Sequence, residues 1–284
     1  MEGYVSVPLK VRQGLGTMKP LPATANRLIA ALQREDTALS TVSDVIEYDQ
    51  VIAGRVLQLA RSAAYSGAMP IQDVHTATMR LGTATILELV LGDYLRTLKM
   101  KAPLYDLDED DLWAHGAAAS LAVRALKQEC PHTRVPEAAQ PAALMHDIGK
   151  LVLVRTVQVR PTDVIGLAAQ KSITWVEAER ELIGCDHAEV GALLARHWEL
   201  PEDLCRAIAH HHDQPIVEPD PVIDAVVFAN YVAKSIGTGL GAEGLNIGMD
   251  ARVSKRLGVE RDSFDRICLQ TFNWLNDLRR TIAA

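Results

Sequence analysis

Long hydrophobic runs, aromatic residues and paired cysteines are all scarce in this 284-residue chain. No apolar stretch approaches the roughly 20 residues that a membrane-spanning helix needs. The N-terminus also lacks the basic, apolar and small-residue order of a signal peptide. We therefore expect a cytoplasmic protein with no membrane partner. The four cysteines form no C-x-x-C pair, which argues against a zinc ribbon and a dense disulfide framework.

Aromatic and basic side chains are too few for the usual modes of nucleic-acid binding. Aromatic residues make up 5% of the chain, and the formal net charge is −7, which repels a polyanion. We do not expect a nucleic-acid partner. The chain also contains no G-x-x-x-x-G-K-[ST] phosphate loop, which excludes nucleoside triphosphate hydrolysis by that route.

Helical periodicity runs through most of the chain, and no segment shows the alternation of a half-buried strand. Thr174 and Glu177 form the pattern of a capping box, and Gly184 marks the end of the helix that follows. We predict an all-α, multi-helix bundle. Further helices are expected over residues 44–64, 112–126, 201–212 and 264–278.

Histidine carries the first sign of chemistry. His115, His187 and His211 each fall on a helix face that is otherwise apolar. One such histidine alone is more often a core side chain whose ring N–H finds a carbonyl oxygen. Several in one core favour a shared metal ion, because one cation can satisfy and orient all of the rings.

The segment Ala142-Ala-Leu-Met-His-Asp-Ile-Gly-Lys150 lies between these histidines. His146 and Asp147 offer an imidazole and a carboxylate from one turn, and Lys150 follows Asp147 by three residues. An imidazole and a carboxylate suit a divalent cation, while an ammonium can neutralise a phosphate oxygen. This pattern predicts a site for a metal and a phosphate.

Taken together, these motifs resemble the HD superfamily of metal-dependent phosphohydrolases, and within it the HDOD group of bacterial signalling proteins. The resemblance spans roughly residues 12–235. Its first part consists of Lys19-Pro-Leu-Pro-Ala23, Val45-Ile-Glu-Tyr-Asp49, Val56-Leu-Gln-Leu-Ala-Arg-Ser62, Tyr65, Pro70-Ile71 and a Leu81-Gly82 turn. Its second part consists of Leu112-Trp-Ala-His115, Leu144-Met-His-Asp-Ile-Gly-Lys150, Asp186-His-Ala-Glu-Val-Gly191, Leu200-Pro201 and His210-His-His212.

The resemblance implies an N-terminal helical subdomain and an HD-like helical bundle with a central polar pocket. We place the first part of the HDOD domain at residues 1–103, the bundle at 104–235 and a C-terminal helical extension at 236–284. Active relatives carry a late aspartate where this chain has Asn230, and an amide brings no charge to a dication. The implied metal ligands are His115, His146, Asp147, His187, His211, His212 and Asn230, with Asp147 and Lys150 as catalytic residues.

Two functions stay open at this point. The first is a bacterial regulatory module that is not catalytic and acts through a signalling protein partner or a phosphorylated or nucleotide ligand in the pocket. The alternative is a weak metal-dependent phosphohydrolase with Fe, Mn or Mg, and the regulatory module could also lack a metal. The chain reads His212-Asp-Gln-Pro-Ile216 where the HD-GYP group has Gly-Tyr-Pro, so we do not expect cyclic di-GMP hydrolysis.

Overall fold

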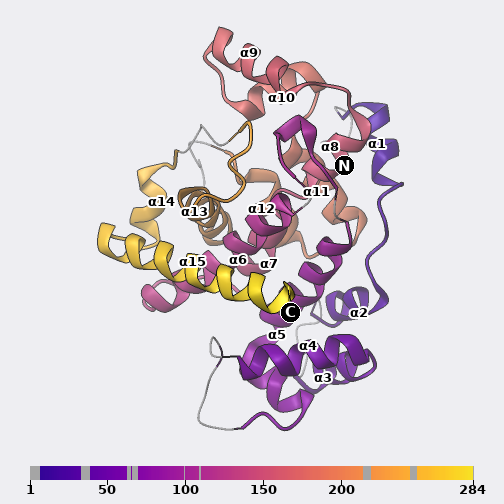
Figure 1. Ribbon diagram of the computed structural model, residues 1–284, viewed down its shortest axis with the longest axis vertical. Coiled ribbons are helices and arrows are strands. Elements are labelled where there is room, and N and C mark those ends of the chain that lie inside the picture. Colours follow the sequence, from indigo (N-terminus) through magenta and orange to yellow (C-terminus); the bar gives the residue numbers. More distant parts are fainter. Residues whose placement is uncertain are drawn as a thin grey trace.

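The computed structural model describes residues 7–32, 39–62, 65, 70–98, 100–108, 110–213, 219–243 and 248–283. Within these ranges the regular elements are helices, and the one β-type pairing is an isolated bridge between Ala102 and Leu107 (Figure 1). This confirms the predicted all-α class. The helices are α1 (Leu9–Leu15), α2 (Ala23–Leu32), α3 (Leu39–Glu47), α4 (Gln50–Arg61), α5 (Val74–Thr97), the short 3₁₀ helix η3 (Pro103–Tyr105), α6 (Asp111–Glu129), α7 (Ala139–Met145), α8 (Gly149–Thr156), α9 (Pro161–Lys171), α10 (Trp175–Ile183), α11 (His187–His197), α12 (Glu202–His210), α13 (Pro221–Ser235), α14 (Ala251–Arg256) and α15 (Arg261–Ala283).

Most of the helices expected from the sequence form where the pattern put them. Thr174 and Glu177 close the predicted capping box at the start of α10, and Gly184 follows its last turn with a positive φ of 88°. The predicted helices at 112–126 and 264–278 lie within α6 and α15, and α12 covers most of 201–212. The capping and periodicity rules therefore suffice for these elements.

The single helix predicted over residues 44–64 is wrong, because the chain breaks between α3 and α4. Asp49 is the reason: its carboxylate accepts a hydrogen bond from the backbone N of Ile52 at 3.1 Å and starts a new helix. The Thr24 hydroxyl donates to the same carboxylate at 2.7 Å and ties this break to α2. Residues 63 and 64 lie outside the described residues.

Helices α2, α3 and α4 form an N-terminal group at one end of the molecule (Figure 1), whereas α1 packs against α8 and α11. Helices α2, α3 and α4 pack against α5, and α9 packs against α10 at the opposite end (Figure 1). Helix α5 is interrupted at the expected Leu81-Gly82 turn, where Gly82 has a φ of +74°, a conformation that favours glycine. The interruption redirects the second half of α5 toward α7.

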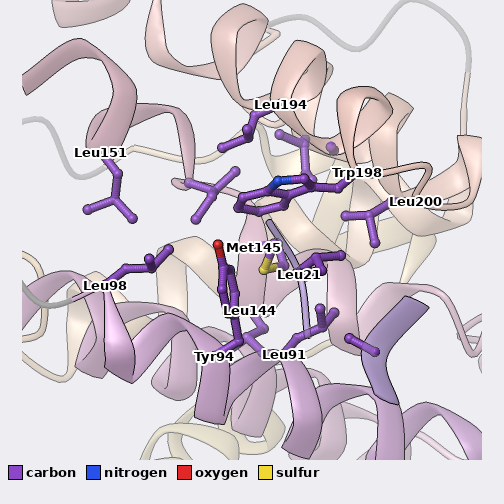
Figure 2. Packing of buried hydrophobic residues seen from close by; sticks show 14 of the residues in the cluster. Leu21, Leu91, Tyr94, Leu98, Leu144, Met145, Leu151, Leu194, Trp198 and Leu200 are labelled. Atoms are coloured by element: carbon purple, nitrogen blue, oxygen red, sulfur yellow. The ribbon is translucent and has the colours of Figure 1, made fainter. Parts of the chain in front are cut away.

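A continuous hydrophobic cluster joins this N-terminal group to the central helices. Figure 2 shows part of it, with Tyr94 of α5 below Trp198, which directly follows α11. Their ring centroids lie 5.4 Å apart, edge to face. The cluster takes buried residues from both sides of the expected boundary at residue 103, so the two parts bury their apolar surfaces together.

A second hydrophobic cluster holds the C-terminal helices on the bundle. Helix α15 packs against α6 and α13, and α14 packs against α13. Ile267 and Leu275 of α15 are fully buried in this cluster. The division at 1–103, 104–235 and 236–284 stays a prediction, but the last segment does dock on the bundle. No helix in the described part of the chain is long and apolar enough to span a membrane.

Candidate metal centre

The structure brings all of the site residues expected from the sequence to one interior point. They come from six separate places in the chain: His115 from α6, His146 and Asp147 from the turn between α7 and α8, Lys150 from α8, His187 from the start of α11, His211 and His212 from the end of α12, and Asn230 from α13. All are buried except His212, whose side chain is 19% exposed. The centre is therefore held inside the bundle.

A glycine allows the closest of these approaches. A Cβ atom on Gly149 would lie 1.9 Å from the carbonyl oxygen of His187 and 2.5 Å from the backbone N of Gly191. Only a residue without a side chain lets α8 lie this close to α11. Asp186 caps α11 by accepting from the backbone N of Glu189 at 2.8 Å, which makes His187 the first residue of that helix.

Asp147 lies between two sets of imidazoles. Its Oδ1 atom is 3.3 Å from His187 Nε2 and 3.6 Å from His211 Nε2. Its Oδ2 atom is 3.5 Å from His146 Nε2 and 3.6 Å from His115 Nε2. One set combines His115, His146 and Asp147, and the other combines Asp147, His187, His211 and His212, with ligand atoms in each set within 4.8 Å of one another. One carboxylate is thus shared by both sets.

Backbone carbonyls fix the orientation of three rings. His146 Nδ1 donates to Ala143 O at 2.7 Å, His211 Nδ1 to Ile208 O at 2.8 Å, and His115 Nδ1 to Thr238 O at 3.2 Å. A carbonyl oxygen only accepts, so each Nδ1 carries the proton and each Nε2 presents a lone pair to the centre. This is the arrangement found in metal-ligating histidines.

Burial keeps the His115 and His146 rings uncharged near neutral pH. It lowers the pKa of His115 to about 4 and holds the pKa of His146 well below its ordinary value. Asp147 Oδ1 and His211 Nε2 are buried and make no hydrogen bond within the described residues. Unpaired buried acceptors are costly, and a cation among them would remove that cost. The donor set therefore fits a metal ion.

Glu179 was not predicted from the sequence, yet it supports the second set. Its buried carboxylate accepts from Tyr105 Oη at 2.7 Å, Trp175 Nε1 at 2.9 Å, and His187 through the backbone N at 3.0 Å and through Nδ1 at 2.8 Å. Burial lowers the pKa of His187, but Glu179 outweighs it and the pKa rises to about 10. Glu179 could have been found from the sequence, because it shares the buried face of α10 with Trp175.

Lys150, Lys234 and Glu243 form an ion-paired group that contacts Asp147 through Lys150. Lys150 Nζ lies 2.8 Å from Asp147 Oδ2 and 2.6 Å from Glu243 Oε2, and Lys234 Nζ lies 3.0 Å from Glu243 Oε1. Burial lowers the pKa of Lys150, but the two carboxylates outweigh it and raise the pKa above its usual value. Burial raises the pKa of Glu243, yet the two lysines hold it well below its ordinary range.

Lys234 and Glu243 were also missed in the sequence analysis. Lys234 follows Asn230 by four residues on α13, so both lie on one face, and this spacing is a signal that could have found it. Glu243 lies in a glycine-rich connection with no pattern of its own. Asn230 Oδ1 is 3.1 Å from His115 Nε2, so the expected amide does reach the first set.

A cavity of about 470 Å³ opens beside the centre. Its wall is formed by the first turns of α10, the residues that follow α12, and α13. The residues that line it include Trp175, Arg180, His211, His212, Asn230, Tyr231, Lys234 and Glu243. A small polar ligand can therefore approach the centre from this side.

The sequence matches the model of one known protein family. The HDOD domain family model matches residues 18–214, which include every residue of both sets. This chain belongs to the HDOD family. The expected family resemblance is confirmed, although the roles of the individual site residues stay predictions.

Two solved structures share the fold, and one further protein is similar in sequence. A crystal structure of an HDOD domain protein with unknown function from Geobacter sulfurreducens is 26% identical, with 96% of this chain and 94% of that chain covered and a TM-score of 0.64. A "Putative phosphohydrolase" from Shewanella amazonensis SB2B is 23% identical, with 94% and 98% covered and a TM-score of 0.63. An uncharacterized protein of Treponema pallidum (strain Nichols) is 24% identical over 214 residues, and this chain covers 41% of its length.

Proposed function

We propose that this HDOD protein is a regulatory module that holds a divalent cation and acts through ligand and partner binding, not through turnover. The observation that carries the proposal is that the charged groups of the centre are already paired with one another. Lys150, the residue expected to meet a phosphoryl group, is already paired with Asp147 and with Glu243 of the same chain. A substrate would have to displace an internal ion pair before it could react.

The proposed ligands of the cation are the histidines of the two sets and Asp147, with the Asn230 amide beside His115. Nitrogen and carboxylate oxygen donors suit Fe, Mn and similar ions, and Mg less well. A bound cation would supply Lewis-acid chemistry and lower the pKa of a coordinated water. Asp147 would orient that water, and the three backbone carbonyls would hold the imidazole lone pairs in place.

Charge balance favours one cation over two. The carboxylates of Asp147, Glu179 and Glu243 and the ammonium groups of Lys150 and Lys234 sum to one net negative charge once every imidazole, His187 included, has lost its extra proton, as a metal ligand must. One dication inverts this charge modestly, whereas two would leave a large positive charge in a buried site. An aspartate in place of Asn230 would have reduced this positive charge.

We propose a cytoplasmic signalling protein as the partner, and a phosphorylated or nucleotide molecule as the ligand of the pocket. A structural relative from Marinobacter aquaeolei VT8, 20% identical, is described as a "Putative signal transduction protein". That description supports the proposed signalling role. Neither a membrane nor a nucleic acid is part of the proposal.

A second candidate function is weak metal-dependent phosphohydrolysis. The cavity of about 470 Å³ favours it, because its wall includes His211, His212 and Lys234 and so gives a phosphate ester access to the second set. In this function Asp147 and Lys150 would be the catalytic residues. Asp147 would orient the attacking water, and Lys150 would neutralise charge on the phosphoryl oxygens after release from Glu243.

The test uses the full chain purified without chelators, as wild type, Asp147→Asn and the control Asp203→Asn. Asp203 is an exposed residue paired with Arg206. Elemental analysis should find about one equivalent of transition metal in the wild type and the control, and almost none in D147N. The wild type should hydrolyse bis(p-nitrophenyl) phosphate and p-nitrophenyl phosphate no faster than D147N does.

Two results would overturn the proposal. Turnover by the wild type that D147N abolishes would establish the phosphohydrolase instead. A wild type that remains without metal after incubation with Fe²⁺ and Mn²⁺ would refute the metal centre.

A further inference from the structure

Glu243 lies where an anionic ligand of the pocket would bind. Its two carboxylate oxygens pair with Lys150 Nζ at 2.6 Å and with Lys234 Nζ at 3.0 Å, and Oε1 is 3.7 Å from His212 Nε2. The side chain is buried and also forms part of the cavity wall. A carboxylate therefore occupies the point beside this cavity where two buried ammonium groups meet.

The backbone segment that leads to Glu243 packs directly against His115 of the centre. Thr238 O accepts the Nδ1–H of His115 at 3.2 Å, and the backbone N of Ala242 donates to Tyr105 O at 2.8 Å. Gly239 has a φ of +64°, and a Cβ there would lie 2.6 Å from the His115 ring. The segment 238–243 thus contacts His115 of the first set through Thr238, and it pairs with Lys150 and Lys234 through Glu243.

Electrostatics explain why something must occupy this point. Without Glu243, the buried Lys234 would lose the carboxylate that it pairs with, and the buried Lys150 would keep Asp147. A buried charge that loses its partner costs several kcal/mol, so another anion would be drawn in. A monoanionic carboxylate would gain little over Glu243, which is already tethered there. A phosphoryl group offers two or three oxygens and up to two charges, and lysine binds phosphate well.

We propose that Glu243 is an internal competitor that occupies the phosphoryl subsite formed by Lys150, Lys234 and His212, and that a phosphorylated ligand displaces it. The inference deepens the proposed function and rests on it only for the ligand-binding role of the pocket. Displacement would release residues 238–243 from the lysine pair. Ligand binding would thereby be coupled to a segment that also holds His115.

The test compares the wild type with Glu243→Gln and with the control Glu137→Gln, an exposed residue paired with Lys127. The probe is inorganic phosphate, titrated by calorimetry into protein kept metal-free with a chelator, with chloride at matched ionic strength as the blank. E243Q should bind phosphate at least about tenfold more tightly than the wild type. E137Q should match the wild type, and Lys234→Met added to E243Q should remove the gain.

Equal phosphate affinity in E243Q and the wild type would overturn the inference, as would a gain that survives K234M. Hydrogen exchange on the wild type gives a second test that needs no variant. Phosphate at a saturating concentration should speed exchange at the Ala242 amide, and unchanged exchange there would also overturn the inference.

The two proposals fail separately. A protein that binds no metal while E243Q still gains phosphate affinity would refute the metal centre and leave the role of Glu243 standing. Metal binding without any gain in E243Q would do the reverse, because the phosphate titration is made on metal-free protein.

Discussion

The Nε2 atoms of His115 and His146 lie 3.2 Å apart, although the Nδ1 of each ring donates to a backbone carbonyl. Both Nε2 atoms therefore present lone pairs to each other when the rings are neutral. Burial keeps the pKa of both rings low, so a proton does not readily settle between them near neutral pH. The metal ion of the proposed centre, bound to both nitrogens, would stabilise this contact.

Metal removal should accordingly destabilise the protein. Addition of Mn²⁺ to chelator-treated wild type should raise the melting temperature, because a ligand that binds only the native state at a hundredfold excess over its Kd adds about 2.7 kcal/mol. His115→Gln should show a much smaller rise in differential scanning fluorimetry. His132→Gln is the control, since His132 is exposed. A full rise in H115Q would exclude His115 from the metal site.

Glu179→Gln should be strongly destabilising. The carboxylate accepts hydrogen bonds from Tyr105, Trp175 and His187 in a fully buried position, and an amide keeps the shape but can accept through one atom only. We expect a loss of about 3–5 kcal/mol in the free energy of unfolding, measured by urea denaturation. Glu181→Gln, which breaks an exposed pair with Lys171, should cost less than about 1 kcal/mol. Similar losses in both variants would contradict this role for Glu179.

Gly149→Ala should disrupt the packing of α8 on α11. The new methyl group would overlap the carbonyl of His187, which is backbone and cannot rotate away. We expect a loss of at least about 3 kcal/mol, together with weaker metal binding because His187 is displaced from Asp147. The matched control is Gly166→Ala in α9, where no described atom beyond the neighbouring residues and the helix's own backbone lies within 4 Å of the new Cβ, and a gain of about 0.5–1 kcal/mol is expected. Equal stability of the two variants would show that the close contact is unimportant.

The stability contributed by Asp220 should depend on pH. Asp220 caps α13, the helix that carries Asn230 and Lys234, by accepting from the backbone N of Val222 and Ile223, and it pairs with Arg206. Burial raises the pKa of Asp220, but these partners outweigh it and the pKa falls below the ordinary value of 3.8. The contribution is therefore fully present above pH 3.8 and is lost as the pH falls through the folded-state pKa.

Asp220→Asn tests this dependence, because asparagine still caps a helix while losing the charge. At pH 7 the variant should lose about 1 kcal/mol in urea unfolding, and the difference should shrink at pH 3. A loss of the same size at both pH values would show that the charge of Asp220 has no part in stability.

Local signals in the sequence were enough for much of the fold. The capping box at Thr174, the helix-ending Gly184 and the three-and-four spacing of α6 and α15 depend on contacts within one or two turns. The same rules missed the break at Asp49, because periodicity continues from α3 into α4 and the cap depends partly on Thr24, 25 residues away. Local pattern therefore determines an element more reliably than its ends.

The amino-acid sequence by itself determined that this is an all-helical HDOD protein and which histidines, with Asp147, Lys150 and Asn230, belong to its centre. His115, His187 and His211 stood out as polar side chains on otherwise apolar helix faces, whereas the other residues came from the His-Asp segment and from the resemblance to the HDOD group. Only the tertiary structure decided that Asp147 is shared by two imidazole sets and that Glu243 pairs with Lys150 across 93 positions of the chain. Pairings of this kind arise from how helices pack, and a residue in an irregular connection carries no periodicity that could reveal its partner.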